Sequence, residues 1–207
     1  QDAISVVQTA EGALNETTSI LQRMRDLTVQ GGNEGSLTTA AAANIQAEIT
    51  ALTTTLNDIA ANTKFNGTEL LDGTYSATFQ VGANGGETVA VAVGTAMTAT
   101  GLGIGAMAAI DGTNATATTN LGLIDTAIGT VSTTRASLGA KQNQLDHVIN
   151  NANVALENVT ASESRIRDTD MASEMVSFTR SQILSQAGTA MLAQAKSIPQ
   201  GVLQLLQ

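Results

Sequence analysis

A heptad repeat of apolar residues between residues 121 and 166 is the feature that most constrains the fold of this chain. Steps of three and four residues alternate along it, and every position is apolar apart from Arg135, Gln142 and Glu163. The positions are Leu121, Ile124, Ile128, Val131, Arg135, Leu138, Gln142, Leu145, Ile149, Ala152, Leu156, Val159, Glu163 and Ile166. A seam of this length predicts one long helix packed against other helices. Such a helix is a scaffold rather than the wall of a pocket.

Aromatic residues are scarce, and this argues against a round core. They make up 2% of the 207 residues, and there is no tryptophan. Large rings normally supply much of the buried area of a compact core. Alanine, threonine and aliphatic residues must do the packing here, which a thin helical bundle permits.

Two further helices are predicted at the start of the chain. The first covers residues 1 to about 30 and ends at Gly31 and Gly32, since glycine commonly follows a helix. The second covers residues 37 to 63, with Ser36 as its expected N-cap. Their apolar residues recur at helical spacing: Ile4, Val7, Leu14, Leu21, Met24 and Leu27, then Ile45, Ile49, Leu52, Leu56 and Ile59. The short glycine turn between them predicts antiparallel packing.

After Asn66-Gly67 the period of the pattern changes to two. Residues 75 to 81 alternate apolar and polar, a glycine-rich turn follows, and Val89, Val91 and Val93 alternate in return. This pattern predicts a β-hairpin over about 75 to 93. Residues 94 to 119 are mostly glycine, alanine and threonine and are expected to form a loop or weakly ordered hairpin.

The fold predicted from these segments is mainly α. It is an elongated antiparallel coiled-coil rod over residues 1 to 166, with helices at about 1–30, 37–63 and 120–166 and a small β-hairpin region at one end. A charged connector at 164 to 170 joins the rod to a C-terminal helical segment at 171 to 207.

The C-terminal segment is apolar and has no partner left over in the chain. Its large apolar residues include Phe178, Ile183, Leu184, Met191, Leu192, Val202, Leu203 and Leu206. Pro199 and Gly201 are expected to interrupt it, so a membrane span is not expected. We expect other protein molecules to bury this segment.

The charge and the rare residue types exclude several classes of function. The formal net charge is −9, and nine basic residues spread along the chain offer no cationic face for nucleic acid. The chain has no cysteine, and His147 is its single histidine. A catalytic triad, a metal site and a bound cofactor are therefore not expected.

Several blocks in order closely resemble bacterial flagellins. They are residues 8–16 (QTAEGALNE), 21–30 (LQRMRDLTVQ), 45–49 (IQAEI), 65–67 (FNG), 80–84 (QVGAN), 164–166 (SRI) and 182–188 (QILSQAG). The resemblance implies a secreted structural subunit that self-assembles into the extracellular flagellar filament through its terminal helices. The resemblance also leads us to expect that the segment that pairs with residues 171 to 207 is absent from the start of the chain. The 94 to 119 stretch stands where larger flagellins carry outer domains.

The resemblance also implies partners and sites. Arg23, Leu27 and Glu48 match positions that serve subunit packing and recognition by the flagellin-sensing Toll-like receptor. The apolar C-terminal segment matches the part held by a flagellar export chaperone and used in polymerisation. A hook-filament junction protein of the same superfamily remains an alternative, and an enzyme carried on a flagellin would need an insert that this chain lacks.

Overall fold

The computed structural model describes residues 1–35, 37–168 and 170–205, with side chains as far as residue 196. Contacts within the chain divide it into two units, residues 1–153 and residues 154–207, here called unit 1 and unit 2. Unit 1 ends earlier than the expected rod boundary at residue 166. The reason is that the described apolar residues of the seam beyond Asn153 are exposed, with no described element packed against them.

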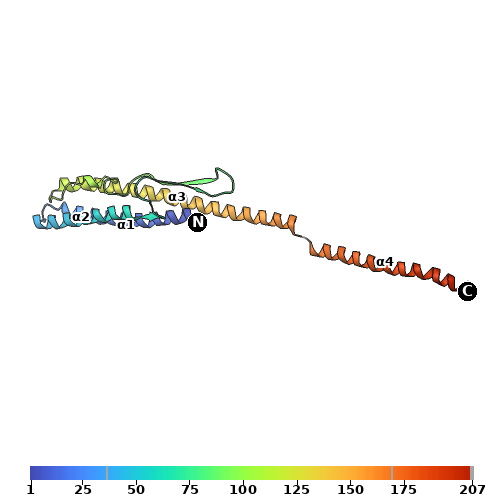
Figure 1. Cartoon of the computed structure of the whole chain (residues 1–207). Coiled ribbons are helices and arrows are strands. Elements are labelled where there is room, and N and C mark those ends of the chain that lie inside the picture. The colour runs from blue at the N-terminus through green and yellow to red at the C-terminus, as the bar shows by residue number, and fades with distance from the viewer. Residues whose placement is uncertain (36, 169, 206–207) are drawn as a thin grey trace. The chain divides into compact units, whose positions relative to one another are not determined.

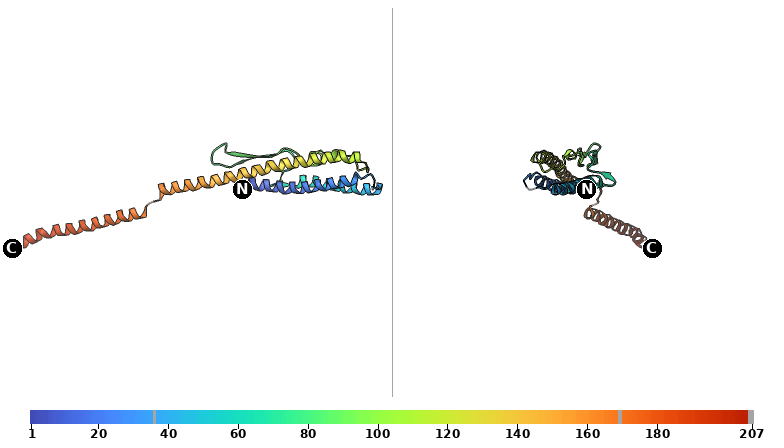
Figure 2. Two further views of the ribbon diagram at one scale, coloured as in Figure 1. Left: turned by 180° about the vertical axis from the view of Figure 1, so that it is seen from behind. Right: turned by 90° about the vertical axis from the view of Figure 1, so that its left-hand side faces the viewer.

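Three helices form the body of unit 1. Helix α1 spans Asp2–Gly31, α2 spans Thr39–Asn62, and α3 spans Asn114–Arg167. In unit 1 these helices lie side by side (Figures 1 and 2). One apolar cluster joins them, and its fully buried members include Leu14, Leu21, Met24, Leu56, Ile124, Val131 and Leu138. The predicted mainly α fold with a small antiparallel sheet is confirmed.

The junction between α1 and α2 differs from the predicted one. The N-cap of α2 is Thr38, whose hydroxyl accepts a hydrogen bond from the Ala41 amide at 3.2 Å, so the prediction of Ser36 is wrong. Ser36 itself lies outside the described residues. Gly32 ends α1 with an ordinary φ of −84°. A Cβ at Gly32 would lie 2.5 Å from the Ala117 Cβ, so this glycine serves a close approach to α3 rather than a left-handed cap.

Two antiparallel hairpins follow α2. Strands β3 (Tyr75–Gln80) and β4 (Thr88–Val93) pair with Phe79 opposite Val89 in the predicted region. The second hairpin was not predicted. Its strands β1 (Lys64–Phe65) and β2 (Thr68–Glu69) are joined by Asn66 and Gly67, with φ values of 49° and 81°. Both values are typical of the two-residue type I′ turn that Asn-Gly favours.

Residues 94 to 113 form a largely irregular loop that packs as a layer on the helices, and the sequence did not predict this packing. Five of its apolar residues are buried, namely Met97, Ala99, Leu102, Ile104 and Ile110. Ile104–Ala106 forms a short 3-10 helix, labelled η1. Side-chain amides bind its backbone: Asn57 and Gln46 accept from the amides of Ala99 and Ile110 at 2.9 and 2.8 Å. Helix α3 also begins at Asn114, six residues before its predicted start at residue 120.

Unit 2 consists of the end of α3 and helix α4, Met171–Leu205. Asp170 holds the start of α4, because one of its carboxylate oxygens accepts the amides of Ala172 and Ser173 at 2.9 and 3.2 Å. Pro199 and Gly201 lie inside α4 and do not interrupt it.

Candidate protein-interaction surfaces

Arg23 and Glu48 meet across α1 and α2. The Arg23 Nη2 atom lies 2.6 Å from Glu48 Oε1, and Arg23 Nε donates to the same oxygen at 2.8 Å. About half of each side chain is exposed. The antiparallel packing of α1 on α2 brings together two residues 25 positions apart. An exposed pair of this kind stabilises a fold by only about 0.2 to 1 kcal/mol, so its charges remain available to a partner.

Leu27, the apolar member of the expected receptor surface, lies in the core. It is 2% exposed and belongs to the same cluster as Leu14 and Leu21. The reason is its phase, because Leu27 follows Met24 by three residues on the buried stripe of α1. Leu27 therefore cannot be an exposed anchor beside Arg23 in this structure.

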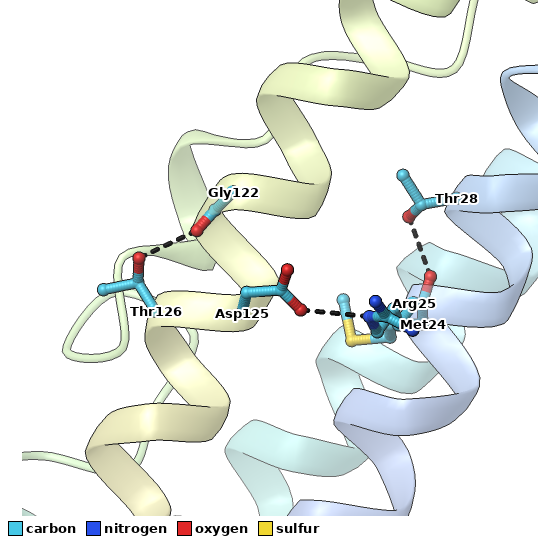
Figure 3. A network of polar contacts seen from close by, with 6 residues as sticks. All are labelled: Met24, Arg25, Thr28, Gly122, Asp125 and Thr126. Atoms are coloured by element: carbon cyan, nitrogen blue, oxygen red, sulfur yellow. Dashed lines mark hydrogen bonds and ion pairs between the residues drawn. The ribbon is translucent and has the colours of Figure 1, made fainter.

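A second ion pair, which the sequence did not reveal, joins α1 to α3. Arg25 Nε donates to Asp125 Oδ1 at 3.0 Å (Figure 3). Beside it the Thr28 hydroxyl donates to the Met24 carbonyl at 2.7 Å. Arg23 and Arg25 thus pair with two different helices. The two arginines therefore link α1 to each of its neighbouring helices, α2 and α3.

The predicted polymerisation segment is an exposed apolar helix. The described side chains of Phe178, Ile183, Leu184, Met191 and Leu192 are all 59% or more exposed. Val202 and Leu203 belong to α4, but their side chains lie outside the described part, as does Leu206 altogether. Exposed apolar surface on this scale marks a site of interaction with other molecules.

The charged turns of unit 1 are structural. Hydrogen bonds from Thr74, first its hydroxyl and then its amide, lower the pKa of Asp72. The amide and hydroxyl of Thr113 lower the pKa of Asp111 in the same way, and Asn84 lowers that of Glu87. His147 is exposed. Within the described residues no cluster of potential metal ligands is found, and no helix is long and apolar enough to span a membrane.

Comparison with known families covers most of the chain. The sequence model of the bacterial flagellin N-terminal helical region matches residues 1–76, and that of the bacterial flagellin C-terminal helical region matches residues 121–206. Because the first match begins at residue 1, the expectation that the N-terminal segment is absent is not supported.

Individual relatives agree with the family match. A flagellin of Bacillus subtilis (strain 168) is 47% identical, over all of this chain and 78% of the relative. Flagellin FlaB2 of Treponema pallidum (strain Nichols) is 43% identical, over all of this chain and 77% of the relative. The crystal structure of Bacillus cereus flagellin aligns with a TM-score of 0.64 at 32% identity, covering 73% of this chain and 86% of that one. The chain therefore belongs to the family of bacterial flagellins, structural proteins of the extracellular flagellar filament and not enzymes.

Proposed function

We propose that this protein is a filament subunit whose copies assemble through the apolar helices of unit 2. The observation that carries the proposal is the row of exposed apolar residues on α4, together with Leu156 and Val159 at the end of α3. Burying one large apolar side chain contributes about 1.5 to 3 kcal/mol. Several such residues together outweigh the association cost of about 4 to 15 kcal/mol. A hook-filament junction protein is the less favoured alternative, because the relatives described above are flagellins.

The test is assembly of the intact purified protein, observed by negative-stain microscopy. Added salt should promote assembly by screening the net charge of −9. Leu184→Asp should prevent filaments, because it places a charge on the apolar surface. Gln186→Asp, a change at an exposed polar residue of the same helix, is the matched control and should leave filaments intact. Equal assembly of both variants would refute a role for the apolar face.

We also propose that an export chaperone holds unit 2 before assembly. An apolar helix without a partner is suited to a hydrophobic groove, and α4 is such a helix among the described residues. Deleting residues 171 to 207 should abolish chaperone binding in calorimetry and leave the circular dichroism of unit 1 nearly unchanged. Undiminished binding after the deletion would show that the chaperone binds elsewhere.

Recognition by the flagellin-sensing Toll-like receptor through Arg23, Leu27 and Glu48 remains a proposal. The exposed, paired Arg23 and Glu48 support it, and the buried Leu27 would act by holding this part of α1 in place. Arg23→Ala should weaken receptor binding by about 1 to 3 kcal/mol, as loss of an interface arginine often does. Arg25→Ala, which breaks the pair with Asp125 instead, is the matched control in a receptor reporter assay. Full signalling by Arg23→Ala would contradict the proposal.

A further inference from the structure

Three of the chain's four aromatic residues line one groove in unit 1. Phe65, Tyr75 and Phe79 lie along a groove of about 610 Å³ between the β1–β2 turn and strand β3. All three rings are only half-buried. Other large apolar side chains of unit 1, such as Ile20 and Ile128, are half-buried in the same way, and Val29 is more than half exposed. What distinguishes the groove is that it gathers three partly exposed rings in one place.

Carboxylates and no cations line the same groove. Glu69 and Asp72 contribute to its walls, and none of its lining residues is lysine, arginine or histidine. Lys64 pairs with Glu69 at 2.9 Å. Asp72 accepts hydrogen bonds from the amide and hydroxyl of Thr74, and it pairs with no cation among the described residues. Open rings beside a carboxylate suit a cationic side chain, because the ring face and the carboxylate both attract positive charge.

Three residues in unit 2, Arg165-Ile166-Arg167, place an apolar side chain between two cations. Ile166 is 88% exposed, more than any other large apolar residue whose exposure is described, and it stands between Arg165 and Arg167. Arg167 pairs with Glu163 at 3.0 Å, while Arg165 bonds the Ser162 hydroxyl and no described carboxylate. The similar Arg-Met-Arg stretch of α1 differs, since its Met24 is fully buried.

We propose that the Arg165-Ile166-Arg167 segment of one copy docks in the aromatic groove of a second copy. Ile166 would cover the ring surface, and Arg165 would lie beside Asp72. The groove and the segment are different surfaces, so each copy offers one of each. Such a heterologous contact generates an open helical filament when the rotation between copies does not close a ring. The inference deepens the proposed filament function and rests on it.

The absence of cysteine from the chain allows a specific cross-linking test. One variant carries Ser76→Cys, an exposed residue that lines the groove, and the other carries Ile166→Cys. The two proteins are mixed, brought to assembly conditions and oxidised with copper phenanthroline, and linked peptides are identified by mass spectrometry. Thr88→Cys is the matched control for the groove position, because Thr88 is exposed on the same sheet and does not line the groove.

We expect the link between residues 76 and 166 to form at least tenfold more than the link between 88 and 166. Adding Arg165→Glu to the Ile166→Cys protein should reduce the first link several-fold, and Arg165→Lys should not. Parent filaments with equal yields of the two links would overturn the inference and leave the filament function standing. A parent protein that forms no filaments would overturn the proposed function, and this contact with it.

Discussion

The two ends of α3 carry the same heptad pattern in opposite surroundings. Leu138 in unit 1 is 1% exposed, whereas Leu156 in unit 2, on the same apolar seam, is 66% exposed. A 3.5-residue period therefore shows that a helix has a face to bury. It does not show whether the partner belongs to the same chain.

The same contrast extends to the whole of each unit. Unit 1 has a core to which three helices, the β3–β4 hairpin and the layer at 94–113 all contribute. In unit 2 the large apolar side chains of α4 are exposed wherever they are described. Most of the stability of a helix in a protein comes from tertiary packing. We therefore expect unit 1 to unfold cooperatively and unit 2 to depend on partners.

The largest expected effect comes from shortening the seam leucine in each unit. Leu138→Ala should destabilise unit 1 by about 2 to 5 kcal/mol, because it removes buried contacts and leaves a cavity. Leu156→Ala, the matched change in unit 2, should alter stability by no more than about 0.5 kcal/mol. Urea unfolding can be followed by circular dichroism at 222 nm and by the near-ultraviolet signal of Tyr75, the only tyrosine. Similar losses from both variants would break the comparison.

A buried amide in unit 1 should produce the next largest effect. Asn120 is fully buried, donates to the Ala108 carbonyl at 2.8 Å and accepts from the Ala108 amide at 2.9 Å. Asn120→Ala leaves both backbone groups without this partner and should cost about 1 to 3 kcal/mol.

Asn151→Ala, at an exposed position of the same helix, is the control and should be nearly neutral. Hydrogen exchange provides a local readout. Protection of the Ala108 amide should fall in the Asn120 variant and remain unchanged in the control. Unchanged protection in both would show that the layer at 94–113 does not depend on Asn120.

Glycine-to-alanine changes should have opposite effects on stability in the two units, destabilising unit 1 and stabilising α4 in unit 2. Gly32→Ala should destabilise unit 1 by about 1 to 3 kcal/mol through overpacking, because the Ala117 Cβ cannot rotate away. Gly188→Ala has open space in α4 and should favour the helix by about 0.5 to 1 kcal/mol. Thermal melts of the two variants would test this, and a stabilising Gly32→Ala would contradict the close approach.

Sequence patterns predicted those parts of the fold whose signal is local and periodic. The three helices and the β3–β4 hairpin follow from spacing alone. The loop at 94–113 was predicted without its packing on the helices, because that packing depends on amides contributed by Gln46, Asn57 and Asn120 from distant parts of the sequence. The Thr38 cap was missed because Ser36 and Thr38 are both good capping residues, and local chemistry cannot choose between them.

Surface positions were harder to predict than the core. The sequence placed Arg23 near Glu48, and antiparallel packing brings them together. It also placed Leu27 on the apolar stripe, which is incompatible with an exposed anchor. The Arg25–Asp125 pair spans 100 residues and depends on the register of α1 against α3. No repeat in the sequence fixes that register at the level of single side chains.

The smallest expected effect is a loss of stability of unit 1 in acid. Asp72, Glu87 and Asp111 have lowered pKa values, and all three lie in this unit. A carboxyl whose pKa is lower in the folded state adds stability that is fully present above its unfolded pKa of about 4. That contribution is lost as the pH falls through the lowered value.

The Asp111→Asn variant keeps an oxygen that can accept from the Thr113 amide, and its side chain cannot titrate. The melting temperature of this variant should therefore fall less than that of the parent between about pH 5 and pH 2. Glu157→Gln, at an exposed position of unit 2, is the control and should follow the parent curve. If Asp111→Asn also followed the parent curve throughout, the turn before α3 would add no acid-sensitive stability, and the two units would not differ in this respect.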